Sequence, residues 1–131
     1  MIIRFIVEVM GRPEAVVEQT LKKVVESVAE RHKIIHTDYS AAEKIDKSDL
    51  FSAFVEFEFE VDDFEQLFSA VIDYGPACIE VIEPNEIKIK CSALQGALSD
   101  LVAKIHKMSQ AIQILQVENM KLKKSDETTK K

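Results

Sequence analysis

Two stretches of the chain alternate apolar and polar residues, which is the pattern of a β-strand with one buried face. In residues 2–9, one face carries Ile3, Phe5, Val7 and Val9, and the other carries Ile2, Arg4, Ile6 and Glu8. In residues 51–61, one face carries Ala53, Val55, Phe57, Phe59 and Val61, and the other carries Phe54, Glu56, Glu58 and Glu60. Residues 33–40 predict a further strand. Residues 77–90 predict one or two short strands, and the turn-forming pair Pro84-Asn85 favours a hairpin.

Two stretches with helical periodicity lie between these strands. After Pro13, a residue suited to the first helical position, an apolar stripe runs along a helix that ends near Arg31; it consists of Val17, Leu21, Val24 and Val28. The second helix begins at a capping box of Asp62 with Glu65 and ends at Gly75-Pro76. Its apolar face consists of Phe64, Leu67, Phe68 and Val71.

The order of these elements is strand, helix, strand, twice over, with an extra strand before a long C-terminal helix. Two such units in about 90 residues predict an α+β fold, a ferredoxin-like βαββαβ sandwich whose first and third strands are central neighbours. We expect a head domain in residues 1–90, a coiled-coil helix in residues 91–123, and a disordered Lys-rich tail in residues 124–131.

Near the C-terminus, nine positions follow one another at alternating steps of four and three residues, which defines a heptad seam. Leu98, Ile105, Ile112 and Asn119 occupy a, and Leu94, Leu101, Met108, Leu115 and Leu122 occupy d. Ile at a, Leu at d and one Asn at a favour a parallel two-stranded coiled coil. The capping box of Ser92 with Gln95 predicts where the helix begins.

An alternative is that the same helix packs on its own domain. Asn119 favours pairing, because a buried Asn can bond its symmetry mate in a parallel dimer but needs an unrelated partner in a domain core. The flanking positions include Ala97, Val102 and Ala111, so the apolar seam is wider than two strands require.

The charge of the chain is divided unevenly. Residues 1–90 hold 10 Lys or Arg and 19 Asp or Glu, a net charge of −9, whereas residues 91–131 hold 7 and 4, a net charge of +3. An acidic head is repelled by phosphate backbones. The chain has no apolar run that could span a membrane, and Cys78 and Cys91 have neither metal-ligand spacing nor a disulfide framework. We therefore expect a cytoplasmic protein with no membrane partner, in which both cysteines are small apolar fillers.

The polar faces of the first and third strands are the candidate partner-binding surface. RNA-binding sheets of this topology need exposed aromatic residues in a basic surround, whereas this face offers one aromatic residue among glutamates, so we expect no direct nucleic-acid contact there. The expected surface consists of Ile2, Arg4, Ile6, Phe54, Glu56 and Glu58. Its apolar members suit a second protein surface, and the alternative is a solvated face with scattered apolar residues.

Catalytic patterns are absent from the sequence. His32, His36 and His106 fall on different predicted elements, and the three glycines are too scattered to form a phosphate-binding loop. We expect no catalytic residues, no metal site and no cofactor.

Two resemblances to known families add to this interpretation. The turn Met10-Gly11-Arg12-Pro13 resembles the strand-to-helix turn of ACT-type domains, which implies binding of a small molecule at a dimer interface, although Glu14 stands where such domains commonly have a second Gly. Residues 51–106, especially EIKIKCSALQGALSDLVAKI, are similar to the small dimerising subunit of the KEOPS tRNA-modification complex. That similarity implies a dimeric subunit of a larger assembly.

Taken together, these features predict a non-enzymatic homodimer that presents two acidic heads to a larger protein or ribonucleoprotein assembly. The alternative is an ACT-like sensor domain with a ligand between the heads.

Overall fold

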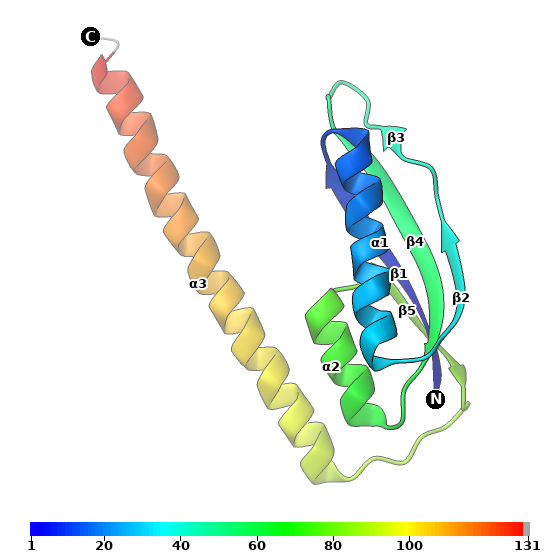
Figure 1. Ribbon diagram of the computed structural model, residues 1–131. Helices are drawn as coiled ribbons and strands as arrows, with labels where there is room; N and C mark the ends of the chain where they lie inside the picture. Colours follow the sequence, from blue (N-terminus) through cyan, green and yellow to red (C-terminus); the bar gives the residue numbers. More distant parts are fainter. Residues whose placement is uncertain (130–131) are drawn as a thin grey trace. The chain divides into compact units, whose positions relative to one another are not determined.

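The computed structural model describes the backbone of residues 1–129 and the side chains of residues 1–125. The chain divides into two compact units, a head, Met1–Ile89, and a helical unit that starts at Lys90. The elements are β1 (Ile2–Gly11), α1 (Glu14–Arg31), β2 (Ile34–Tyr39), β3 (Glu43–Lys44), β4 (Phe51–Glu60), α2 (Phe64–Tyr74), β5 (Cys78–Glu83) and α3 (Cys91–Thr129) (Figure 1). Among the described residues, no helix is long and apolar enough to cross a bilayer.

The head is built on an antiparallel sheet in which β1 and β4 are the central neighbours. The strand order is β2-β4-β1-β5, and the short β3 pairs with β4. Phe5 lies opposite Phe57 and Arg4 opposite Glu58, so each strand presents its apolar residues to one side and its polar residues to the other. The strand order and the two helices confirm the α+β class and the ferredoxin-like arrangement that the sequence predicts.

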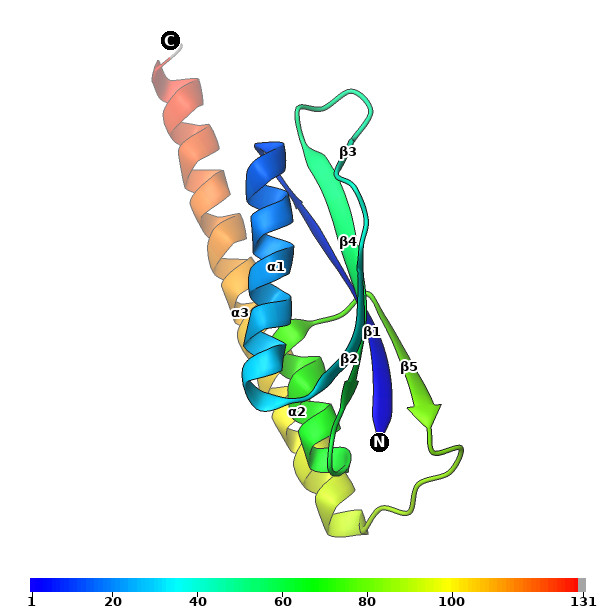
Figure 2. The ribbon, with the colours of Figure 1, turned by 45° about the vertical axis from the view of Figure 1, so that its right-hand side comes forward.

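Both helices of the head cover the apolar side of the sheet (Figure 2). Ile3, Phe5, Val55, Phe57 and Phe59 are fully buried there, together with Val17, Leu21 and Val28 from α1 and Leu67 and Ala70 from α2. The alternation in β1 and β4 and the stripe on α1 are therefore confirmed. On the opposite side of the sheet the side chains have no covering layer within the head.

Of the two predictions for the ends of α2, the one for the N-terminus is wrong and the one for the C-terminus is confirmed. The N-cap is Asp63, whose side chain accepts a hydrogen bond from the backbone N–H of Gln66, so the predicted box of Asp62 with Glu65 is wrong by one residue. Gln66 in turn accepts a hydrogen bond from the backbone N–H of Asp62 at 2.9 Å. At the other end, Gly75 adopts the left-handed conformation, with φ of 51°, and caps the helix as predicted.

The predicted hairpin in residues 77–90 is wrong. β5 ends at Glu83, and residues 84–90 form no strand. Pro84 explains this in part, because its fixed negative φ is incompatible with the first central position of the tight two-residue hairpin turns.

The long C-terminal helix is present and begins at Cys91, as predicted, but Ser92 is not its N-cap. The backbone N–H of Leu94 donates to the carbonyl of Lys90, so Ser92 lies inside the first turn and does not precede the helix. The helix also continues through Thr129, so the part of the expected disordered tail that the structure describes is helical; Lys130 and Lys131 lie outside the described residues. No Gly or Pro follows Gly96, and Lys and Glu are good helix formers, which explains the extension.

Candidate partner-binding surfaces

The first candidate surface is the heptad seam of α3, which is nine positions on one uninterrupted helix of 39 residues. Its apolar side chains are largely in water in the single chain, with exposed fractions that rise from 41% at Leu94 to 65% at Leu122. Leu98, Ile105, Met108, Ile112 and Leu115 lie between these values, Leu101 is half-buried, and Asn119 is exposed. A row of large apolar side chains at this spacing is typical of a helix face that packs against another surface.

Apolar side chains also lie beside this seam and on the far side of α3. Val102, in a flanking position, is 64% exposed. Ile114, Val117 and Met120 are 51–62% exposed at positions that a two-stranded coiled coil leaves in water. These three residues were not predicted to be part of an apolar surface, although seven of the twelve residues from 111 to 122 are apolar.

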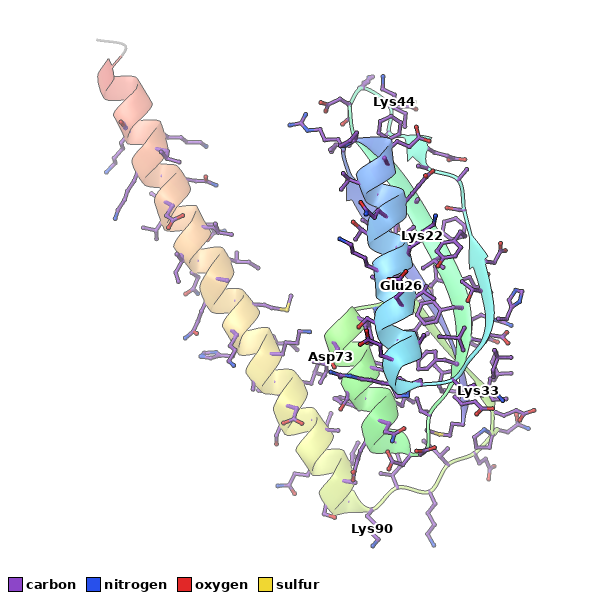
Figure 3. All side chains as sticks on the ribbon, in the orientation of Figure 1. Lys22, Glu26, Lys33, Lys44, Asp73 and Lys90 are labelled. Atoms are coloured by element: carbon purple, nitrogen blue, oxygen red, sulfur yellow. The ribbon has the colours of Figure 1, made fainter. Side chains whose placement is uncertain are left out.

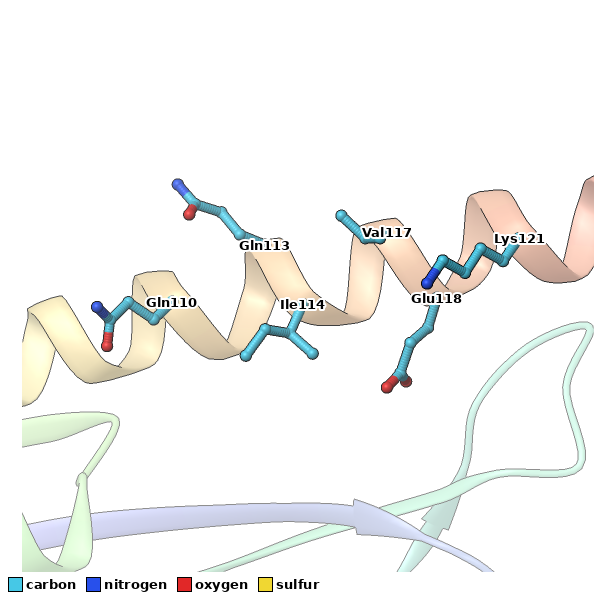
Figure 4. Close-up of a pocket in the computed structure, with 6 residues that line it drawn as sticks. All are labelled: Gln110, Gln113, Ile114, Val117, Glu118 and Lys121. Atoms are coloured by element: carbon cyan, nitrogen blue, oxygen red, sulfur yellow. The ribbon is translucent and has the colours of Figure 1, made fainter.

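A shallow concavity runs along the same part of α3 (Figure 4). Its lining residues all come from this one helix and are Gln110, Gln113, Ile114, Val117, Glu118 and Lys121. Side chains of a single helix face form an open groove, whereas small-molecule sites are enclosed clefts that bury most of the ligand. We therefore treat it as part of the helix surface and not as a ligand pocket.

The second candidate surface is the outer sheet face, which we define as Ile2, Arg4, Ile6 and Glu8 of β1 with Phe54, Glu56, Glu58 and Glu60 of β4. The register places Ile6 opposite Glu56 and Glu8 opposite Phe54. The structure therefore brings together on one face all six residues that the sequence proposes for partner binding. Phe54 is 46% exposed, and Ile2 and Ile6 are half-buried.

Arg4 is the centre of this face. Its Nη2 donates to Glu58 Oε1 at 2.8 Å, its Nη1 donates to Glu80 Oε2 at 2.6 Å, and its Nε lies 3.1 Å from Glu56 Oε1. The hydrogen bond to Glu58, followed by the charges of the surrounding carboxylates, raises the pKa of the Arg4 guanidinium. Arg4 is therefore a permanent cation among three carboxylates, and the apolar residues lie around a charged centre.

The two edge strands add three residues to this face that were not predicted. Glu80 of β5 lies opposite Arg4, and His36 and Asp38 of β2 lie opposite Glu58 and Glu56. Glu80 could have been placed on this face from the strand order alone, because in that order the last strand lies beside the first. Glu80 and Asp38 make the face more acidic, so it offers many carboxylates to a cationic partner.

Residues with catalytic or metal-binding chemistry are scattered in the structure. His32 caps the C-terminus of α1, His36 lies on β2, and His106 lies on α3. Within residues 1–125, no three His, Cys, Asp or Glu side chains come together in a way that could hold a metal ion. Cys78 and Cys91 are both exposed, so the expectation that they fill apolar space is wrong; Cys78 lies on the edge strand and Cys91 begins α3.

Comparisons with known proteins identify a family and nothing beyond it. Neither a curated protein nor a solved structure matches the chain, so the ACT and KEOPS resemblances gain no support. The family model that matches spans residues 2–130, which include all of the head except Met1, and the whole of α3. The chain therefore belongs to the MJ0538 family.

Proposed function

We propose that this protein is a non-catalytic homodimeric adaptor or regulatory subunit. Two chains pair in parallel through α3 and present two acidic heads to a larger protein or ribonucleoprotein assembly. The observation that carries the proposal is the heptad seam, whose large side chains are about half exposed along a continuous helix.

The energetics of the seam support pairing. Completing the burial of a half-exposed Leu, Ile or Met contributes about 1 kcal/mol, so eight such residues on each of two helices contribute on the order of 15 kcal/mol. Association costs about 4–15 kcal/mol in lost translational and rotational freedom. The gain from burial therefore equals or exceeds the cost of association.

The heads give the dimer its partner surface. Each outer sheet face combines apolar side chains with carboxylates around Arg4, a mixture found where protein surfaces meet. Two identical faces on one particle bind a repeated or symmetric partner with a gain in effective concentration, which raises avidity without any new contact.

Sedimentation of the full chain tests the pairing. We expect the wild type to sediment as a dimer at micromolar concentration and the variant Ile105→Asp/Ile112→Asp to sediment as a monomer, because both residues occupy a positions. The matched control, Ala103→Asp/Gln110→Asp, adds the same two charges at exposed f positions and keeps the dimer. A monomeric wild type, or a control that dissociates as readily as the seam variant, contradicts the proposal.

Capture from the source organism's lysate tests the adaptor role. The immobilised dimer should retain a specific partner, and the monomeric seam variant should retain it 10²–10⁴-fold more weakly, the range expected for lost bivalency. Equal retention by the two chains contradicts a role for bivalency.

The ACT-like alternative makes a different prediction. A sensor domain is stabilised by its ligand, by about 2.7 kcal/mol at 100 times the dissociation constant. In a thermal-shift screen against amino acids and nucleotides, we expect no stabilisation; a specific upward shift in melting temperature favours the sensor.

A further inference from the structure

The edge strand β5 carries two apolar side chains on the helix-covered side of the sheet that are not covered. Ile79 lies opposite Phe5, and Val81 lies opposite Ile3. Phe5 and Ile3 are fully buried, yet Ile79 is 48% exposed and Val81 42% exposed. The layer of side chains that closes the core over β1 therefore stops short of β5.

The backbone of β5 is open along the same edge. In the strand order β2-β4-β1-β5, β5 pairs only with β1 within the described residues. An antiparallel strand with one neighbour leaves alternate N–H and C=O groups without a ladder partner, and such edges template the addition of another strand. A single added strand satisfies the open backbone and covers Ile79 and Val81.

Residues 86–90 of this chain have the sequence pattern of that missing strand. Glu86, Lys88 and Lys90 alternate with Ile87 and Ile89, a period of two. In the structure these residues form no strand, and Ile87 is 44% exposed. Lys90, at the end of the segment, is also exposed (Figure 3).

The charges of the segment complement those of β5. Glu80 and Glu83 lie on the outer side of β5, opposite Arg4 and Ile2 of β1. A strand whose two isoleucines cover Ile79 and Val81 places its lysines on the side where these glutamates lie, because successive side chains point to opposite faces. The apolar sides are then matched, and Lys88 and Lys90 lie on the side of Glu80 and Glu83; Glu86 shares that side, so the segment brings a net charge of +1 to it.

A tight hairpin within one chain is disfavoured by the residue that follows β5. Pro84 holds φ near −65°, whereas the two-residue hairpin turns of types I′ and II′ need a positive φ at their first central residue. A two-residue turn at Pro84-Asn85 is thus excluded, and a return onto the chain's own β5 would need a longer loop. An identical edge in a second copy has no such restriction.

We propose that residues 86–90 of one chain pair with the β5 edge of a second copy, so that the two heads of the dimer exchange strands. This inference rests on the proposed pairing of α3. The segment ends where α3 begins, so parallel pairing of two α3 helices brings both segments to the same end of the dimer. Exchange in both directions is the self-complementary arrangement that a two-fold axis requires.

Isotope-filtered NMR on mixed dimers tests the exchange. Dimers are formed from one chain with ¹³C-labelled Val methyls and one unlabelled chain, by unfolding and refolding a mixture of the two. We expect cross-peaks between Val81 of the labelled chain and Ile87 or Ile89 of the unlabelled chain. Cross-peaks confined to one chain indicate a local hairpin and overturn the proposal, and their absence from a dimer indicates an open edge and also overturns it.

A second measurement distinguishes a failure of the strand exchange from a failure of the proposed pairing through α3. In the wild-type dimer, the backbone amides of residues 88–90 should exchange with deuterium at least 10-fold more slowly than in Ile87→Pro, which removes a donor from the segment. Both chains should still sediment as dimers through α3. A wild-type chain that sediments as a monomer overturns the proposed function, whereas a dimer with equally fast exchange in both chains overturns only the strand exchange.

Discussion

Arg4 of β1 lies directly opposite Glu58 of β4, and its Nη2 donates to Glu58 Oε1 at 2.8 Å. The same guanidinium contacts Glu56 and Glu80, so one cation on β1 holds three carboxylates, two on β4 and one on β5. If Arg4 were removed, these carboxylates would repel one another across the sheet.

We expect Arg4→Gln to lower the melting temperature more than Glu58→Gln, because the first leaves three like charges and the second leaves Arg4 with two partners. The double variant should lose less than the sum of the two single losses, and added salt should reduce the loss in Arg4→Gln by screening. Thermal unfolding at low and high ionic strength measures this. The control is Arg12→Gln, which breaks one exposed pair with Asp49 and should have little effect; additive losses that do not respond to salt contradict the expectation.

Phe5 belongs to the aromatic cluster of the core, and we expect its substitution to destabilise the protein more than the substitution of Arg4. Its ring lies edge-on to Phe59, with centroids 4.8 Å apart, and close to Phe57 at 5.9 Å. Phe5→Ala should therefore lower the free energy of unfolding by about 3–5 kcal/mol. Phe54→Ala, on the exposed side of β4, is the matched control and should change it by about 0.5 kcal/mol or less. Urea unfolding of both variants measures the difference, and similar losses would show that the two faces of the sheet are equally covered.

Much of the head could be predicted because a period of two fixes which residues share a face. In β4, Phe57 and Glu58 had to point to opposite sides, and only the apolar side could be buried. Connection rules then placed β1 beside β4. The heptad seam was equally readable, since its spacing is a property of the sequence alone.

The remainder depends on contacts that periodicity does not encode. The pairing of Arg4 with Glu80 depends on the register of β5 against β1, which the path of the chain after Gly75 determines. β3, with two residues, is too short to leave a pattern. The hairpin predicted in residues 77–90 is absent, in part because of Pro84. The alternation of apolar and polar residues on either side of Pro84 suggested a pair of strands, but the restricted backbone of Pro84 excludes the tightest turn between them.

Two adjacent residues before α2, Asp62 and Asp63, are both of a type that can cap a helix N-terminus. Asp63 has the extended backbone of an N-cap, with φ of −149°, and its side chain bonds the N–H of Gln66 at 2.8 Å. Asp63→Ala should therefore lower the free energy of unfolding by about 0.5–2 kcal/mol. Asp62→Ala loses only a 3.3 Å contact with the Gln66 side chain and should cost less. Chemical denaturation of the two variants measures which one loses more free energy of unfolding. A larger loss in Asp62→Ala would show that Asp62 is the N-cap, as the sequence first suggested.

Asn119 tests whether the α3 seam is a coiled coil. It is the one polar residue at an a position, and in a parallel dimer the two Asn side chains bond each other at the cost of stability. We expect Asn119→Leu to raise the free energy of unfolding of the dimer by about 1–3 kcal/mol, because a buried polar pair is replaced by apolar contact. The same change should broaden the distribution of oligomers, since the residue that selects two strands is gone. Sedimentation velocity combined with thermal unfolding measures both effects, and Gln113→Leu, at an exposed b position, is the control. If Asn119→Leu leaves both stability and stoichiometry unchanged, Asn119 does not face a second helix and the seam does not extend to the end of α3.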